Sequence, residues 1–198
     1  MSIKLAAVIL AGGESVRYQG NKLLSRHPSG NALINYVLKQ YAPLCAVPPI
    51  VVTGRYHDRL QTGLSHENCT IVHNAQWSLG MGSSIARGVK AIMTVDADSR
   101  PSHVIVGTGD GAAITTHSIY GLVEQLKQTP NLRVASVVMG RRMSPAIFPA
   151  KDFSKLAALA GEKGAAPLLQ SPSECIGVDH PQARWDIDTP EDWLKIPS

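Results

Sequence analysis

A glycine-rich run near the N-terminus combines the residue types that bind a phosphate group. An apolar segment stops at paired glycines, and because glycine has no Cβ, backbone N–H groups of such a turn can approach an anion closely. Two basic side chains follow within the next ten positions. The run therefore predicts a nucleoside triphosphate site, with a plain strand-to-helix glycine turn as the alternative reading. The residues concerned are Leu10, Ala11, Gly12, Gly13, Arg17 and Lys22.

Acidic residues in two other segments have the chemistry of a divalent metal site. Asp110 follows the apolar run 104–106 between two glycines, and Asp186 and Asp188 lie close to the C-terminus. Mg²⁺ is usually held by one or two carboxylates together with phosphate oxygens and water. A tight Asp-Gly turn would also account for Asp110. The helix start that Thr189 and the following proline predict does not account for the other two acids.

Two further segments carry candidate anion contacts. The run from Gly80 to Ser83 precedes a helical pattern, so its backbone N–H groups are expected to face an anion or to be capped by serine. The adjacent Arg141 and Arg142 predict either a phosphate contact or a solvated edge.

Several of these segments together resemble the MobA-like nucleotidyltransferases, which attach CMP or GMP to the molybdenum cofactor. Residues 10–22 resemble the Leu-Ala-Gly-Gly-x-Ser-x-Arg-x-Gly-x-Lys signature, with the last glycine one position late, and residues 185–192 resemble an Asp-Ile-Asp-Thr-Pro-Glu-Asp ending. Residues 107–112 resemble the Gly-Asp-Gln-Pro segment but read Gly-Ala after the aspartate. Residues 140–149 and 161–166 resemble the cytidylyl branch, although Ala166 stands where arginine is usual.

The resemblance implies Mg²⁺-dependent transfer of CMP from CTP to the terminal phosphate of molybdopterin, with release of pyrophosphate. It implies that Lys22 binds the α-phosphate region and that Arg17 binds the departing phosphates. It makes Asp110 the third catalytic residue beside these two. It makes Asp110 and Asp188 the metal ligands, with Asp186 in reserve. The nucleotide contacts that it implies are Leu10, Ala11, Gly12, Gly13, Lys22, Gly80 and Ser83.

Other functions are compatible with the same residues. The enzyme would use GTP or another phosphorylated acceptor if the N-terminal loop, familiar from guanylyl transfer, decides the substrate. A catalytically weak nucleotide-binding partner of a molybdenum hydroxylase is a second possibility, and a redox enzyme on the same scaffold is a third. The sequence has no dinucleotide fingerprint that would favour the last of these.

The elements that must position these residues alternate between short valine- and isoleucine-rich runs and amphipathic segments. This pattern predicts a doubly wound, mostly parallel sheet of Rossmann-like, glycosyltransferase-A-like type, with ligands at the carboxyl ends of the strands. The predicted strands are 3–10, 49–53, 70–73, 103–107, 133–139, 146–148 and 175–178. The predicted helices are 32–41, 56–64, 83–93, 115–127, 153–160 and 165–170.

Composition narrows the class of protein. The 198 residues, 44% of them hydrophobic, are enough for one core, so a single nucleotidyltransferase domain over residues 1–198 is expected. The net charge of +4 is scattered, which favours a small anionic ligand over nucleic acid. Three widely spaced cysteines predict neither a disulfide framework nor a zinc site and favour the cytoplasm. No apolar run approaches the ~20 residues that a membrane span needs.

Overall fold

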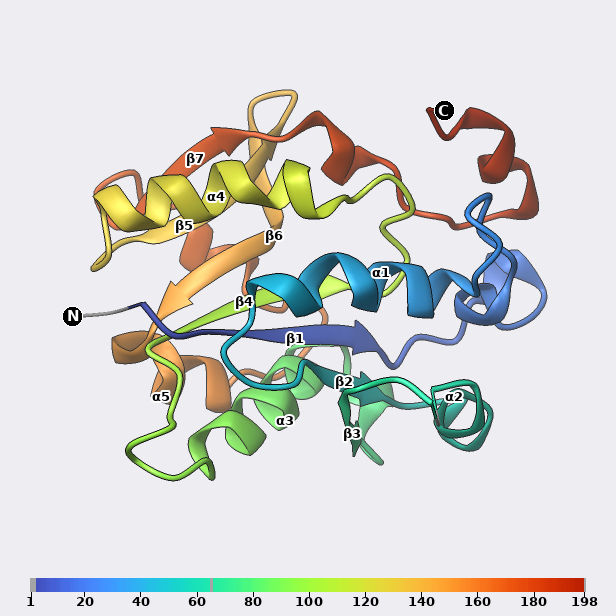
Figure 1. The fold of residues 1–198 in the computed structure, drawn as a ribbon, viewed down its shortest axis with the longest axis horizontal. Coiled ribbons are helices and arrows are strands. Elements are labelled where there is room, and N and C mark those ends of the chain that lie inside the picture. The colour runs from blue at the N-terminus through green and yellow to red at the C-terminus, as the bar shows by residue number, and fades with distance from the viewer. Residues whose placement is uncertain (1–2, 65, 198) are drawn as a thin grey trace.

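The computed structural model describes residues 3–64 and 66–197 and has a seven-stranded sheet in the order β3-β2-β1-β4-β6-β5-β7 (Figure 1). All neighbouring strands are parallel except at β6, which runs antiparallel to both β4 and β5. The strands are β1 (Leu5–Ala11), β2 (Ile50–Thr53), β3 (Thr70–His73), β4 (His103–Thr108), β5 (Arg133–Val138), β6 (Arg141–Pro149) and β7 (Cys175–Asp179). The helices are α1 (Leu33–Tyr41), α2 (His57–Gly63), α3 (Met81–Met93), α4 (Thr116–Gln128) and α5 (Phe153–Ala157).

Strand β1 is central because both of its faces are apolar. Its seven residues, Leu-Ala-Ala-Val-Ile-Leu-Ala, are buried or nearly so. Side chains alternate across a strand, so Ala7 and Ile9 enter one core cluster while Ala6 and Val8 enter the other. A strand that is apolar on both faces must lie inside a three-layer structure, and this one does.

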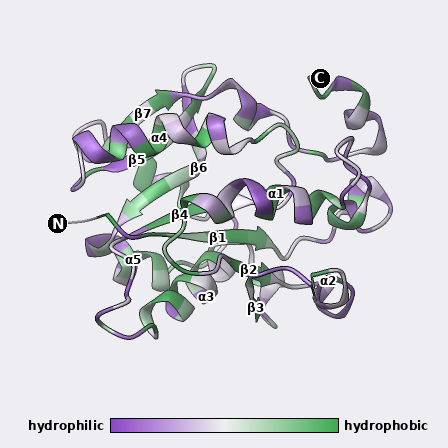
Figure 2. Ribbon diagram, viewed as in Figure 1, coloured by the Kyte–Doolittle hydropathy of each residue, from purple (hydrophilic) through white to green (hydrophobic). Residues whose placement is uncertain are grey.

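The helices supply the two outer layers. Buried residues of α1, α2 and α4 belong to the first cluster, and those of α3 and α5 belong to the second (Figure 1). In α1 the buried positions are 33, 34, 37, 38 and 41, which is the spacing of one helix face. Figure 2 shows the same division, with apolar strands and helices of mixed polarity.

The reversed strand β6 changes which residues reach the ligand edge of the sheet. It follows β5 through the two-residue turn Met139-Gly140, in which both residues have positive φ (49° and 76°). Because β6 runs backwards, its first residues lie beside the carboxyl ends of the parallel strands. Arg142, opposite Val137 of β5, is therefore at the edge where the sequence pattern predicts ligands.

The predicted elements agree with these bounds to within a few residues, and the doubly wound architecture is confirmed. The short strand predicted at 146–148 is wrong in length, because β6 begins five residues earlier in the hairpin with β5. The helix predicted over 153–160 ends at Ala157, and residues 166–169 form a 3-10 turn instead of the predicted helix.

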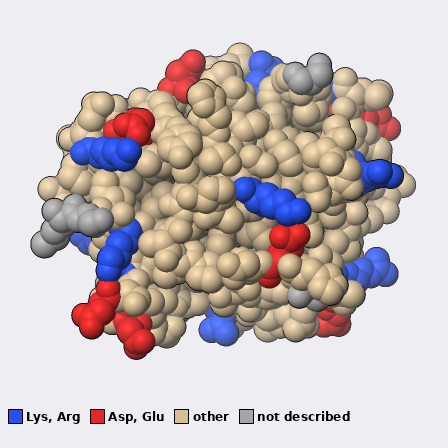
Figure 3. Space-filling view, viewed as in Figure 1, with Lys and Arg blue, Asp and Glu red and all other residues tan. Residues whose placement is uncertain are grey.

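On the face drawn in Figure 3, the described acidic and basic side chains lie in small separate groups over a mostly uncharged surface. None of the helices within residues 3–64 and 66–197 has the length and hydropathy to cross a membrane.

Helix α3 packs closely on the sheet at Gly88, and this packing yields a test of the fold. A Cβ there would lie 2.5 Å from Val8 Cγ1 and 2.9 Å from Val52 Cγ2, two side chains held in the core. We expect Gly88→Ala to lower the free energy of unfolding by about 1–3 kcal/mol, because the overpacking exceeds the gain in helix propensity.

Gly121→Ala in α4 is the matched control for this change. Its Cβ would meet only Val178 Cγ1, at an ordinary 3.5 Å, so a gain of about 0.5–1 kcal/mol is expected. Urea unfolding of both variants checks the pair; equal stabilisation by the two alanines would contradict the packing of α3 described here.

Candidate active site

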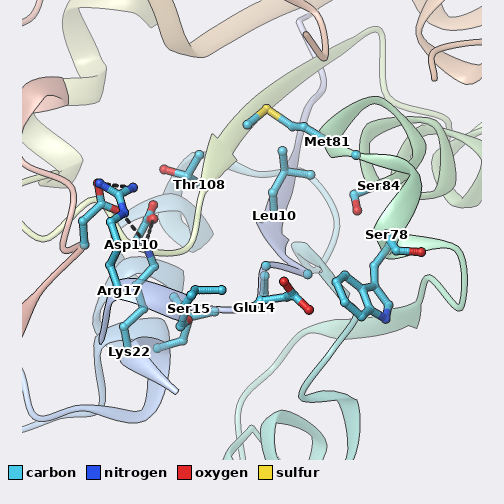
Figure 4. Close-up of a pocket in the computed structure, with 18 of the residues that line it drawn as sticks. Leu10, Glu14, Ser15, Arg17, Lys22, Ser78, Met81, Ser84, Thr108 and Asp110 are labelled. Carbon is cyan, nitrogen blue, oxygen red and sulfur yellow. Dashed lines mark hydrogen bonds and ion pairs between the residues drawn. The ribbon is translucent and has the colours of Figure 1, made fainter. Parts of the chain in front are cut away.

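A cleft of about 550 Å³ opens at the carboxyl ends of β1 and β4. Figure 4 shows Lys22, Arg17 and Asp110 on one side of it and Ser84 on the other. The glycine-rich loop after β1 forms its floor, and Gly13 borders open space, since a Cβ there would have no neighbour within 4 Å. The cleft thus has charged side chains on one side, residues at the start of α3 on the other, and the glycine-rich loop between them.

The local fold around Lys22 holds its ammonium group in the cleft. Residues Lys22–Leu24 form a 3-10 turn whose first N–H groups are capped by Asn21, since its Oδ1 accepts from Leu23 N at 3.1 Å. Leu23 is buried in the core and anchors the turn. The lysine follows directly on the cap, so its direction is fixed by the turn.

The Lys22 ammonium lies between two carboxylates. Its Nζ is 2.6 Å from Asp110 Oδ2 and 3.1 Å from Asp188 Oδ1. Arg17 Nη2 reaches the other oxygen of Asp188 at 2.9 Å, from a largely exposed position. Burial by itself would lower the pKa of Lys22, but the attraction of Asp110 and then Asp188 outweighs it and raises that pKa above its ordinary value. The lysine is therefore fully charged at neutral pH.

Backbone pairing between two distant segments brings the acids together. Ala112 N donates to Trp185 O at 3.0 Å, and Ile187 N donates to Asp110 O at 3.1 Å. These bonds form an isolated antiparallel bridge between Gly111 and Asp186. Ile187 points into the core, so its neighbours on both sides point the opposite way, as expected for an extended segment.

The two C-terminal acids have different surroundings. Asp188 lines the cleft, whereas Asp186 lines a second, smaller cavity beside it. Burial, and then the nearby Asp110 carboxylate, raises the pKa of Asp186 to about 7. Thr189 and Asp192 form a capping box after these acids, and Asp192 Oδ2 accepts from Asp188 N at 3.0 Å. The helix start predicted at Thr189 is thus a 3-10 turn that fixes the backbone of Asp188.

The donor set of the cleft fits a hard divalent cation. Asp110 Oδ1 is buried and has no hydrogen-bond partner among the described residues, so one carboxylate oxygen is left for another ligand. Across residues 3–64 and 66–197, no group of three or more His, Cys, Asp or Glu forms a ready cage for a metal. Two carboxylates completed by phosphate oxygens and water are the arrangement that suits Mg²⁺.

Most residues predicted from the sequence lie in this cleft. Ser83 is not among the residues that line it, whereas its neighbour Ser84 is. The Ser83 hydroxyl donates to Gly80 O at 2.8 Å and accepts from Asn74 Nδ2 at 2.9 Å, so it ties the first turn of α3 to the segment before it. The predicted residues that line the cleft are Leu10, Ala11, Gly12, Gly13, Arg17, Lys22, Gly80, Asp110 and Asp188.

Sequence reasoning missed several lining residues. Thr108 is the last residue of β4, and its place at a strand end beside Asp110 was a usable signal. Trp77 and Ser78 precede α3, and Glu162 comes from a loop whose proximity only the folded chain reveals. That loop packs tightly on α3, since Gly82 N donates to Gly161 O at 2.8 Å.

Comparison with known proteins identifies related sequences and folds. Residues 7–176 match the family model of the MobA-like NTP transferase domain. A curated relative, the bifunctional protein GlmU of Francisella philomiragia subsp. philomiragia, is 28% identical over 123 residues, which cover 62% of this chain and 26% of the relative. The aligned part of this chain thus spans about a quarter of that protein's length.

Solved structures share the fold. A nucleotidyl transferase from Methanothermobacter thermautotrophicus superposes with a TM-score of 0.76 at 20% identity, covering 98% of this chain and 96% of that one. Rv0371c of Mycobacterium tuberculosis H37Rv, solved in complex with manganese, gives a TM-score of 0.72 at 18% identity, covering 98% and 97%. At these identities the likeness concerns the fold.

The ion pairs of Lys22 with Asp110 and Asp188 allow a prediction of how much Lys22 contributes to the free energy of unfolding. Lys22→Met removes the ammonium and leaves two carboxylates facing each other, so we expect a loss of about 1–3 kcal/mol, less than for a fully buried pair. Because the pKa of Lys22 is raised in the folded state, this contribution persists from neutral into alkaline pH and is lost as pH rises through that folded-state pKa.

Lys39→Met is the control, since Lys39 is half exposed and lies 3.7 Å from Glu67. Its loss is expected to stay below about 1 kcal/mol. Thermal and urea unfolding of both variants at neutral pH measure the difference; a Lys22→Met protein as stable as the parent would show that the cluster does not neutralise the acids as described.

Proposed function

Because the chain belongs to the MobA-like NTP transferase family, we propose that it is a nucleotidyltransferase that moves CMP from CTP to the terminal phosphate of molybdopterin and releases pyrophosphate. One observation carries the proposal most directly: Lys22, Asp110 and Asp188 meet in one cleft beside a glycine-rich loop. Phosphoryl chemistry needs this combination of positive charge, carboxylates and free backbone donors.

The proposed reaction is a direct in-line displacement. An oxygen of the acceptor phosphate forms a bond to the α-phosphorus of CTP, and the bond from that phosphorus to the bridging oxygen breaks. Pyrophosphate leaves with the electron pair, so no nucleophile of the protein is required. The protein contributes position and charge stabilisation.

Each charged residue has a place in this scheme. Lys22 binds the α-phosphate region, where charge builds up, and Arg17 at the open rim binds the β- and γ-phosphates. Both side chains are paired with carboxylates in the structure. When the triphosphate binds, its phosphate oxygens replace these carboxylates as the partners of Lys22 and Arg17. This exchange lowers the cost of desolvating the lysine, since it is never left without a counter-charge. The backbone of Ala11, Gly12 and Gly13 is the surface that the nucleotide covers.

Asp110 and Asp188 are the residues that would hold Mg²⁺. The buried, unpartnered Oδ1 of Asp110 supports this assignment, and so does the position of Asp188 across the Lys22 ammonium. When bound there, the cation neutralises triphosphate charge and orients the α-phosphate. Asp186, the bridge partner of Gly111, is the weaker candidate because it lines the second cavity.

The choice of CTP and of molybdopterin rests on sequence resemblance. Residues 140–149 and 161–166 resemble the cytidylyl branch, and in the structure these segments border the cavity next to the cleft. We therefore place the enzyme in the cytoplasm, acting on molybdenum cofactor before its insertion into a molybdenum hydroxylase. GTP or another phosphorylated acceptor is the alternative that direct comparison of substrates tests.

The test is a pyrophosphate-release assay with Mg²⁺, molybdopterin cofactor and each of the four nucleotides. CTP is expected to support turnover best, and removal of Mg²⁺ with EDTA is expected to abolish it. Lys22→Ala and Asp110→Asn are each expected to lower kcat about 100-fold or more, as loss of one charge-stabilising group typically does.

Lys127→Ala is the control, since this residue lies on α4 and pairs with Glu124 at the surface. Its kcat should equal that of the parent. Turnover undiminished in both site variants would refute the catalytic assignment, and preference for GTP would refute the cytidylyl assignment alone. Tight CTP binding without turnover would favour a nucleotide-binding maturation partner instead.

A further inference from the structure

A second cavity of about 260 Å³ adjoins the cleft on the side of the sheet that α3 covers. Met81, Thr108 and Glu162 line both spaces, so the two are continuous at these residues. The nucleotide scheme above does not use this cavity. Its volume is slightly below the ~300–1,000 Å³ of typical small-molecule sites, which suits the body of one small ligand.

The walls of the second cavity are largely apolar. Ile85 of α3, Val106 of β4, Phe148 of β6 and Leu169 all border it. Such walls give few hydrogen bonds and favour a flat ring system over a chain of hydroxyl groups.

Arg142 is one of the charged residues that line the cavity. Its Nε is buried and has no hydrogen-bond partner, and no carboxylate of the described residues lies within ion-pair distance of its guanidinium. Arg133 on the neighbouring strand is the contrast, because it binds Asp152 at 2.7 Å and Glu174 at 3.0 Å. A guanidinium has five N–H donors, so Arg142 is equipped to receive an acceptor group from a ligand.

The charged residues divide the cavity into two ends. Asp186 lies at the end next to the cleft, beside Gly111. A Cβ added to that glycine would lie 3.8 Å from Asp186 Oδ1. Arg142 lies toward Gly177 of β7. A Cβ added to that glycine would lie 3.6 Å from Arg142 Nε. Glu162 and Lys163 come from the exposed loop that borders the cavity. A ligand that spans the cavity therefore has one end near the nucleotide and the other at Arg142.

We propose that this second cavity binds the body of the phosphate acceptor and that Arg142 determines which acceptor fits. The inference rests on the proposed nucleotidyl transfer. The acceptor class is a phosphomonoester that carries a flat aromatic ring system, whose two faces pack on the apolar walls, with a hydrogen-bond acceptor or anionic group at its far end. Its phosphate passes Thr108 to reach Lys22 and the α-phosphorus, while the far end binds the Arg142 guanidinium. Sugar phosphates with several hydroxyl groups are poor ligands of this cavity.

Arg141→Gln and Arg142→Gln provide a matched pair for the test. Both remove one positive charge, but Arg141 is exposed and does not line the cavity, since successive side chains of a strand point to opposite faces. Binding of pterin-6-carboxylate, a flat ring with one anionic group, is measured by calorimetry on the full chain. Ribose 5-phosphate serves as the polyol comparison, and CTP with Mg²⁺ is titrated in parallel.

We expect Arg142→Gln to weaken binding of pterin-6-carboxylate at least tenfold, with Arg141→Gln unchanged and CTP binding equal in all three proteins. Parent protein that does not bind the pterin, or binds ribose 5-phosphate as tightly, overturns the inference even if CTP binds. Equal pterin binding by both glutamine variants overturns it as well. Failure of CTP to bind or to release pyrophosphate would instead refute the proposed function.

Ala166→Phe is a second variant that does not depend on the folding of Arg142→Gln. Ala166 borders the cavity from an exposed 3-10 turn, so a phenylalanine there fills the space without entering the core. It should abolish pterin binding and leave CTP binding intact. Undiminished pterin binding by Ala166→Phe would place that ligand outside the second cavity.

Discussion

The candidate site depends on two backbone hydrogen bonds that join the segments on either side of Gly111 and Asp186. They hold Asp188 close to Asp110, with the Lys22 ammonium between the two carboxylates, although the two acids are far apart in sequence. Two carboxylates at this separation repel each other, and the Lys22 ammonium between them offsets the repulsion. The buried Ile187 fixes which way the neighbouring acids face, so an apolar contact in the core sets the electrostatics of the site.

The rest of the fold brings these three segments to one edge of the sheet. Strand β1 is apolar on both faces and ends directly at the glycine-rich loop, while β4 beside it ends next to Asp110. Helix α3 approaches β1 closely because Gly88 has no side chain, and its N-terminus forms the far wall of the cleft. A rigid sheet thus presents loops whose own conformations are set by caps such as Asn21.

Much of this arrangement could be predicted from the sequence because its signals are local. Continuous apolar runs identify the parallel strands, and the rule that ligands bind at their carboxyl ends identifies the cleft that Gly12, Lys22 and Asp110 share. The choice between Ser83 and Ser84 could not be made, because adjacent residues at a helix start differ only in which way they point. The full extent of β6 was missed since its first half, with Arg142, becomes a strand only by pairing with β5.

The reversed direction of β6 brings a later part of the chain to the cavity beside the cleft. The cleft is built mainly from the N-terminal half, whereas the adjoining cavity draws many of its walls from residues 142–169. Sequence changes in the β5–β6 hairpin therefore alter the adjoining cavity without touching the glycine-rich loop of the cleft. If the two spaces hold the two substrates as proposed, a fold of this kind can exchange its acceptor during evolution while it retains its nucleotide.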